Sequence, residues 1–170
     1  LTCLPFDEFS LFITATIGSA ASGIDGATTD SAVSLMKKTQ LTEAEKETFL
    51  NCSMLLIDEI SYFDRNKIEK LDKHLKILMQ NPTKAYGGLN VIYVGDFHQI
   101  ECFSNNTVYK NDFVQWHSAV NCAIFLENNH RFNDAPEYGK ILEQFRAGNI
   151  EDSTFERINT RLVGSNGVTN

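Results

Sequence analysis

No apolar stretch among the 170 residues approaches the roughly 20 residues that a membrane-spanning helix needs. The longest apolar stretches have the length of a strand, and the sequence does not open with the basic and apolar parts of a signal peptide. With 42% hydrophobic and 22% charged residues, the composition is typical of an intracellular globular protein without a membrane partner. The sequence starts at Leu1 rather than at Met, so a targeting segment ahead of Leu1 would escape this test.

Cysteine is scarce as well, and its spacing argues against a zinc site. The four cysteines stand far apart, without a C-x-x-C pair and without a histidine at zinc-ligand spacing. We therefore expect reduced, mostly buried thiols and no metal site built on them. Cys52 and Cys122 each directly precede a predicted strand, where a small apolar side chain packs well. The other two are Cys3 and Cys102.

The most informative segment present is an apolar run, Met54 to Ile57, that ends in the adjacent carboxylates of Asp58 and Glu59. Hydrolysis of a nucleoside triphosphate uses a magnesium ion and a residue that orients the attacking water, and two carboxylates at a strand end can divide these tasks. Strand alternation sends the two side chains to opposite faces, but a turn at the strand end lets both reach one crevice. Taken alone, the segment is equally compatible with a strand that enters a capped loop with both acids solvated.

A second apolar run, Leu89 to Val94, is followed by Gly95, Asp96 and, three residues further on, Gln99. Gly95 allows a tight exit from a strand, and the Gln99 amide can bond a phosphate oxygen or a water. By itself this segment could also be an ordinary strand-to-turn junction. The two runs together indicate an NTPase.

Helices and strands alternate along the chain. Thr42 and Glu45 form a Thr-x-x-Glu capping box, and Asp64 is a plausible N-cap for a helix with an apolar stripe at helical spacing. Alternation of this kind predicts an α/β fold with a parallel, helix-covered sheet and active groups at the carboxyl ends of its strands. The stripe consists of Ile68, Leu71, Leu75 and Leu78, and the further predicted elements are strands at 11–16 and 123–126 and helices at 29–38 and 43–51.

Three segments, LLIDEIS, VGDFHQI and LENNHRF, resemble motifs II, III and IV of superfamily 1 DNA helicases, most closely the PIF-type branch near RecD. Residues 12–21 and 26–32 are similar to motif Ia of that family, and residues 141–148 and 158–162 to its segment after motif IV. The resemblance covers nearly the whole chain. It implies a RecA-like P-loop NTPase fold, with residues 1–126 as a partial first motor domain and residues 127–170 as the start of the second with a loose tail.

The G-x-x-x-x-G-K-[ST] phosphate loop, which precedes motif Ia in that family, occurs nowhere in the 170 residues. We therefore interpret the sequence as a fragment that begins after the loop, and we expect the fragment itself to be inactive. Three readings stay open: an ATP-dependent helicase moving five-prime to three-prime on single-stranded DNA, a RecD-like exonuclease motor subunit, and a non-catalytic relic that serves as a binding module.

The resemblance implies a role for each candidate residue of the nucleotide site. Asp58 would bind Mg²⁺, Glu59 would act as general base, Gln99 would sense the γ-phosphate, and Arg131 would stabilise the transferring phosphoryl group. For Arg131 the alternative is a surface or interdomain ion pair. The expected ATP-binding residues are Asp58, Glu59, Gly95, Asp96, Gln99 and Arg131.

The resemblance also implies contacts to a single DNA strand. Hydroxyl side chains of motif Ia could instead cap helices and form turns, and Phe97 and His98 could instead be core aromatics of the motif III loop. Where the family has Pro-Thr-Gly, this chain reads Ala15-Thr16-Ile17-Gly18, and Asp30 replaces an expected histidine, so DNA contact at Asp30 is in doubt unless the side chain points away. The expected DNA-binding residues are Thr16, Ser19, Thr28, Ser31, Phe97 and His98.

The net charge of −7 is weak evidence against a nucleic-acid partner, because motor channels hold single strands through local contacts and stacking. From the resemblance we expect ATP and Mg²⁺ as cofactors, single-stranded DNA and duplex junctions as partners, and a monomeric motor. The same resemblance implies roles in DNA repair, recombination or telomere maintenance, in the nucleus or mitochondrion of a eukaryote or otherwise in the cytoplasm.

Overall fold

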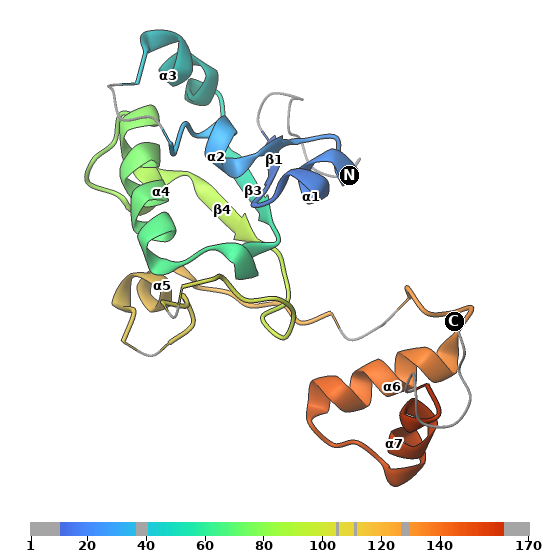
Figure 1. Ribbon diagram of the computed structural model, residues 1–170. Helices are drawn as coiled ribbons and strands as arrows, with labels where there is room; N and C mark the ends of the chain where they lie inside the picture. Colours follow the sequence, from blue (N-terminus) through green and yellow to red (C-terminus); the bar gives the residue numbers. More distant parts are fainter. Residues whose placement is uncertain (1–10, 37–40, 105, 111, 127–129, 162–170) are drawn as a thin grey trace. The chain divides into compact units, whose positions relative to one another are not determined.

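The computed structural model describes residues 11–36, 41–104, 106–110, 112–126 and 130–161 (Figure 1). The chain divides into two units, Leu1–Cys122 and Ala123–Asn170. Among the described helices, none is long and apolar enough to cross a membrane.

The first unit is built on a parallel four-stranded sheet of order β2-β1-β3-β4. Its strands are β1 (Leu11–Ala15), β2 (Ala27–Thr28), β3 (Met54–Asp58) and β4 (Asn90–Tyr93). Every pair is parallel, and the register places Ala15 beside Asp58 and Ile57 beside Tyr93. The carboxyl ends of β1, β3 and β4 therefore meet at one edge, as the predicted α/β fold requires.

Helices connect the strands, as the alternating pattern predicts. The first unit contains α1 (Gly18–Gly23), α2 (Thr29–Ala32), α3 (Glu43–Leu50), η1 (Ile60–Tyr62), α4 (Arg65–Leu78), η2 (Ala85–Gly88) and α5 (Val114–Ala119). The second unit contains α6 (Pro136–Ala147) and α7 (Asp152–Asn159).

The core lies between the sheet and α4. The whole predicted stripe of α4 is buried and packs with Leu55 and Ile57 of β3. Burying one such side chain contributes about 1.5–3 kcal/mol relative to leaving it in water. On the other face of the sheet, Ile13 and Ile92 lie in register with Leu56 and remain 37% and 41% exposed. One face of the sheet is therefore covered more fully than the other.

Both predicted helix caps are confirmed. The Thr42 hydroxyl accepts the Glu45 N–H at 3.4 Å, and the Glu45 carboxylate accepts the Thr42 N–H at 2.6 Å. The Asp64 carboxylate accepts the Lys67 N–H at 2.9 Å at the start of α4. These bonds use N–H groups that the first turn of a helix leaves free, so they fix where α3 and α4 begin.

Two predicted elements are wrong in extent or kind. The helix expected at 29–38 ends at Ala32, because Ser34 has a φ of 54°, which no α-helix tolerates; residues 37–40 lie outside the described residues. The strand expected at 123–126 does not form and has no partner strand in the described part of the protein, and its Ile124, Phe125 and Leu126 are 83–90% exposed. A strand needs a neighbour to bond its backbone groups.

The expectation of mostly buried thiols is also wrong for two of the three described cysteines. Cys52 is buried, Cys102 is half-buried and Cys122 is exposed. Cys122 lacks burial because the strand predicted to follow it does not form. Cys3 lies outside the described residues.

Candidate nucleotide and DNA site

The end of β3 turns sharply at Glu59. Glu59 has φ 57° and ψ 44°, the left-handed region that a residue with a side chain occupies at a cost of about 1–2 kcal/mol. The preceding Asp58 is half-buried, and its Oδ1 accepts the Glu59 N–H at 2.8 Å. Asp58 is thus the last residue of the strand, and the turn takes the Glu59 carboxylate off the alternating course of the strand.

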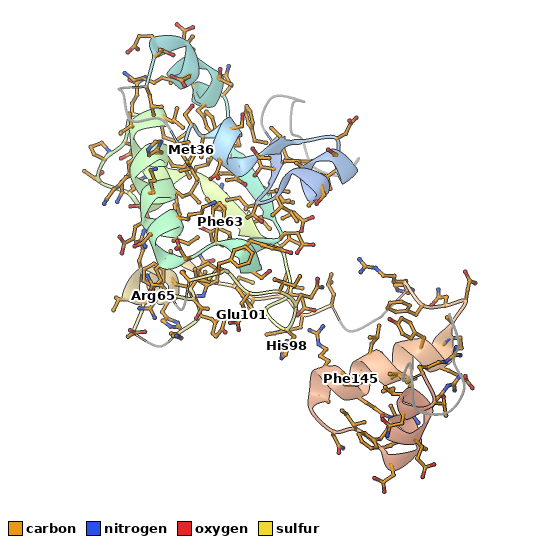
Figure 2. All side chains as sticks on the ribbon, in the orientation of Figure 1. Met36, Phe63, Arg65, His98, Glu101 and Phe145 are labelled. Atoms are coloured by element: carbon orange, nitrogen blue, oxygen red, sulfur yellow. The ribbon has the colours of Figure 1, made fainter. Side chains whose placement is uncertain are left out.

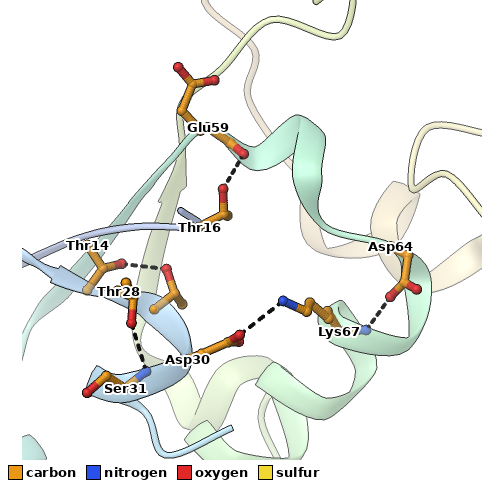
Figure 3. A network of polar contacts seen from close by, with 9 residues as sticks. Thr14, Thr16, Thr28, Asp30, Ser31, Glu59, Asp64 and Lys67 are labelled. Atoms are coloured by element: carbon orange, nitrogen blue, oxygen red, sulfur yellow. Dashed lines mark hydrogen bonds and ion pairs between the residues drawn. The ribbon is translucent and has the colours of Figure 1, made fainter. Parts of the chain in front are cut away.

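The backbone at this turn is held from β1. Thr16 follows β1 and donates its N–H to the Asp58 carbonyl at 3.0 Å, which continues the ladder between β1 and β3. Its hydroxyl donates to the Glu59 carbonyl at 2.6 Å. Figure 3 shows the Glu59 carbonyl pointing to Thr16, while the carboxylate points away from it.

The backbone is also held from β4. The Ile60 N–H donates to the Val94 carbonyl at 3.0 Å, and the Val94 N–H donates to the Ile57 carbonyl at 2.9 Å. Gly95, with φ 154°, lies so close that a Cβ there would be 2.9 Å from the Ile60 nitrogen. Gly95 therefore permits the close approach of the two strand ends, in addition to the tight exit predicted from the sequence.

The segment after β4 makes a turn of its own. The Asp96 carboxylate accepts the His98 N–H at 3.0 Å and the Gln99 side-chain amide at 3.4 Å. The Gln99 N–H donates to the Asp96 carbonyl at 3.1 Å, and His98 Nδ1 lies 3.4 Å from Asp96 Oδ1. His98 and Gln99 are exposed, so their side chains are accessible at this edge of the sheet (Figure 2 labels His98).

Phe97 anchors this turn to the first unit. Its ring lies edge-on to Tyr109 and Trp116, with ring centroids 5.2 Å and 6.1 Å apart, and Trp116 in turn contacts Tyr93 of β4 at 5.0 Å. This packing agrees with the alternative of a core aromatic. His98, by contrast, stays at the surface.

The hydroxyl side chains of the segment after β1 have separate positions. Thr28 caps α2 by accepting the Ser31 N–H at 3.3 Å, while Ser19 and Ser31 are exposed. Thr29 is buried and donates to Thr14 at 3.0 Å. Capping is thus the observed contact of Thr28, whereas Ser19 and Ser31 keep accessible side chains.

Asp30 points towards α4. Its carboxylate pairs with Lys67 at 3.0 Å (Figure 3). The Lys67 ammonium also lies 4.8 Å from the ring centre of Phe63. An acidic group that is paired in this way is a weaker obstacle to a phosphate path. Sequence reasoning missed Lys67: the Asp64 cap fixes its place in the first turn of α4, but no local pattern gives its partner.

Seven of the candidate residues surround the adjoining ends of β1, β3 and β4: Thr16, Asp58, Glu59, Gly95, Asp96, Phe97 and Gln99. Arg131 belongs to the second unit, where it precedes α6.

The chemistry at the end of β3 suits Mg²⁺, which prefers oxygen ligands and usually takes one or two carboxylates together with water and phosphate oxygens. Asp58 offers one half-buried carboxylate. Within the described residues, no three or more His, Cys, Asp or Glu side chains form a group that could hold a metal. Asp58 could thus contribute one ligand, the others coming from water and a bound nucleotide.

Comparison with known proteins matches residues 10–155 to the PIF1-like helicase family model. The chain is 29% identical over 156 residues to the ATP-dependent DNA helicase PIF1 of Saccharomyces cerevisiae (strain YJM789), covering 84% of this chain and 18% of the relative. It is 26% identical over 158 residues to PIF1 of Emericella nidulans, covering 85% of this chain and 21% of the relative. The chain thus spans about a fifth of the length of these relatives.

Solved structures show the same fold. The crystal structure of Pif1 helicase from Candida albicans has a TM-score of 0.70 at 23% identity, over 88% of this chain and 36% of that one. Pif1 from Bacteroides in complex with ADP-AlF3 and single-stranded DNA has a TM-score of 0.67 at 19% identity, over 95% of this chain and 42% of that one.

Proposed function

Because the chain belongs to the PIF1-like helicase family, we propose that it forms part of the motor of an ATP-dependent DNA helicase. The observation that carries the proposal is the left-handed turn at Glu59, which places Asp58 and Glu59 beside the Asp96–Gln99 turn of the neighbouring strand. Two acids and an amide at adjoining carboxyl ends of a parallel sheet suit hydrolysis of a nucleoside triphosphate.

Each residue has a stated task in this proposal. Glu59 orients the attacking water and accepts its proton, and Asp58 holds Mg²⁺ directly or through water. When bound, the ion would neutralise charge on the β- and γ-phosphates. Gln99 contacts the γ-phosphate region, and Arg131 supplies positive charge that stabilises the transferring phosphoryl group. The lysine and backbone amides of a phosphate loop are not among the 170 residues, so this chain alone is not expected to turn over ATP.

Single-stranded DNA is the proposed track. The solved Pif1 structures include Bacteroides Pif1 bound to single-stranded DNA and a study of unwinding at forked duplex DNA by two coordinating Pif1 helicases. In this chain Ser19, Ser31 and His98 are exposed and available to such a partner, whereas Phe97 is packed. We further propose a monomeric motor that travels five-prime to three-prime, acts in repair, recombination or telomere maintenance, and works in the nucleus or mitochondrion of a eukaryotic cell or in the cytoplasm otherwise.

The test is ATP hydrolysis by the full-length protein with saturating single-stranded DNA and Mg²⁺. Glu59→Gln should lower kcat by about 100- to 10,000-fold, the usual contribution of a general base. Glu69→Gln, an exposed acid on α4, is the matched control and should keep the rate. Retained turnover in Glu59→Gln would refute the role of Glu59.

The alternatives predict different results. A non-catalytic relic would bind DNA without hydrolysing ATP, and sequencing of the transcript upstream of the Leu1 codon would find no glycine-rich GKT or GKS loop in frame. A RecD-like subunit would carry accessory domains ahead of that loop.

A further inference from the structure

The proposed general base, Glu59, lies in a strained stretch of backbone. Glu59 occupies the left-handed region, and the direction of its carboxylate depends on that conformation. A residue with a side chain keeps such a conformation only where its surroundings impose it. The contacts that impose it therefore decide where the carboxylate points.

The neighbouring strands β1 and β4 are each followed by a residue that contacts the Glu59 turn, and the two contacts differ in kind. From β4, the Val94 carbonyl holds the Ile60 N–H at 3.0 Å, which is a backbone bond that side-chain substitution leaves in place. From β1, the Thr16 hydroxyl donates to the Glu59 carbonyl at 2.6 Å. The Thr16 bond thus acts on the peptide group of Glu59 itself, through a side chain, from a residue 43 positions away.

We infer that Thr16 is a positioning residue for Glu59: its hydroxyl fixes the left-handed turn that aims the carboxylate. The inference rests on the proposed function for the role of Glu59. It also gives the segment after β1 a second task. Ser19, three residues beyond Thr16, is exposed and is an expected DNA contact, so DNA bound there would lie close in the sequence to the residue that holds the Glu59 turn.

The same pair of strands supplies a matched control. Thr14 makes the same type of bond, from its hydroxyl to the Leu56 carbonyl of β3 at 2.8 Å, two residues before Thr16. Thr14 is buried within β1, and the two hydrogen-bond partners of its side chain are Leu56 and Thr29. Thr14→Val therefore removes a comparable bond between β1 and β3, together with the bond that Thr14 accepts from Thr29, and leaves the Thr16–Glu59 bond in place.

The first measurement is the DNA-stimulated ATPase rate of the full-length protein. Thr16→Val should lower kcat at saturating single-stranded DNA by about tenfold, since a small misplacement of a catalytic group costs one to two orders of magnitude in rate. The DNA concentration for half-stimulation should change by less than about twofold. Thr16→Ser keeps the hydroxyl and should recover most of the rate, and Thr14→Val should lower stability while kcat stays unchanged.

Two outcomes would overturn the inference. If Thr16→Val keeps kcat but needs much more DNA for half-stimulation, Thr16 contacts DNA rather than positioning Glu59. If Thr14→Val lowers kcat as much as Thr16→Val does, the loss reflects general loosening of the sheet.

A second measurement separates this inference from the proposed function. Amide hydrogen exchange at Ile60 reports on the turn whether or not the protein hydrolyses ATP. Thr16→Val should accelerate that exchange by about tenfold, and Thr16→Ser and Thr14→Val should not. A wild-type protein without ATPase activity would refute the proposed function, and the Ile60 exchange would still decide whether Thr16 holds the turn.

Discussion

The ends of β3 and β4 are neighbours and both carry acids, yet they are held differently. The end of β3 is half-buried, and its backbone is bonded from both sides, by Thr16 and by the Val94 carbonyl. The end of β4 continues into a turn in which the Asp96 carboxylate accepts hydrogen bonds from His98 and Gln99, with Phe97 as its aromatic anchor. The Glu59 turn is thus held by bonds from distant parts of the chain, whereas these bonds of the turn after β4 join residues two or three positions apart.

This difference suits the two proposed tasks. A residue that orients a water has to keep one geometry, which the fixed end of β3 provides for Glu59. A residue that senses the γ-phosphate has to move between nucleotide states, and a locally bonded, exposed turn lets Gln99 do so. Four substitutions test the comparison.

Gly95→Ala should break the contact between the two strand ends. The new Cβ would lie 2.9 Å from the Ile60 nitrogen at a φ of 154°, so backbone has to shift, and we expect a loss of about 3 kcal/mol. Native-state hydrogen exchange of the Leu55 and Ile57 amides measures this loss of stability. Gly23→Ala has no atom within 4 Å of its Cβ and should change stability by less than about 1 kcal/mol. Equal exchange rates for both variants would contradict the close approach.

Phe97→Ala should loosen only the turn that follows β4. Phe97 is half-buried against Tyr109 and Trp116, so its truncation should cost about 2 kcal/mol, below the range for a fully buried ring. Exchange should rise at the Gln99 amide and remain slow at Ile60. Phe103→Ala removes a fully exposed ring and should have an effect below about 0.5 kcal/mol. Faster exchange at Ile60 would show that the two ends are not independent.

Tyr93→Phe tests the buried side of β4. Burial raises the pKa of Tyr93 well above its ordinary value of 10, and burial also raises the pKa of Tyr86 beside it. A raised folded-state pKa gives stability that is complete below pH 10 and falls as pH rises towards the folded value. Tyr93→Phe should therefore change stability at pH 7 by less than about 1 kcal/mol and shift alkaline unfolding to higher pH, as circular dichroism would show. An unchanged alkaline midpoint would count against this role.

Asp112→Asn should have the smallest effect. Asp112 pairs with Arg65, which also donates from Nε to the Thr107 carbonyl at 3.0 Å, so the pair ties the chain after β4 to the start of α4 (Figure 2 labels Arg65). The hydrogen bond from Arg65 lowers the pKa of Asp112. A lowered folded-state pKa gives stability above the ordinary value of 3.8 that is lost as pH falls through the folded value.

Thermal unfolding should thus show a small loss for Asp112→Asn at pH 7 and convergence with the wild type in strong acid. Glu69→Gln is the control, because Glu69 is exposed and forms no ion pair with another described residue. A difference that persisted in acid would exclude the ion pair as its cause.

The sequence by itself determined the strand ends, the caps and the helical stripe. The apolar runs before Asp58 and Gly95, the Thr42 and Glu45 capping box and the buried stripe of α4 depend on residues within a few positions of one another, so local pattern suffices.

Only the tertiary structure decided how those pieces hold the site. The bond from Thr16 to Glu59 and the packing of Gly95 on Ile60 join residues 35 or more positions apart, and no local pattern encodes such pairs. The same reason explains the strand that failed at 123–126: its apolar residues favour a strand, but a strand exists only where another segment bonds its backbone, and the described chain supplies none.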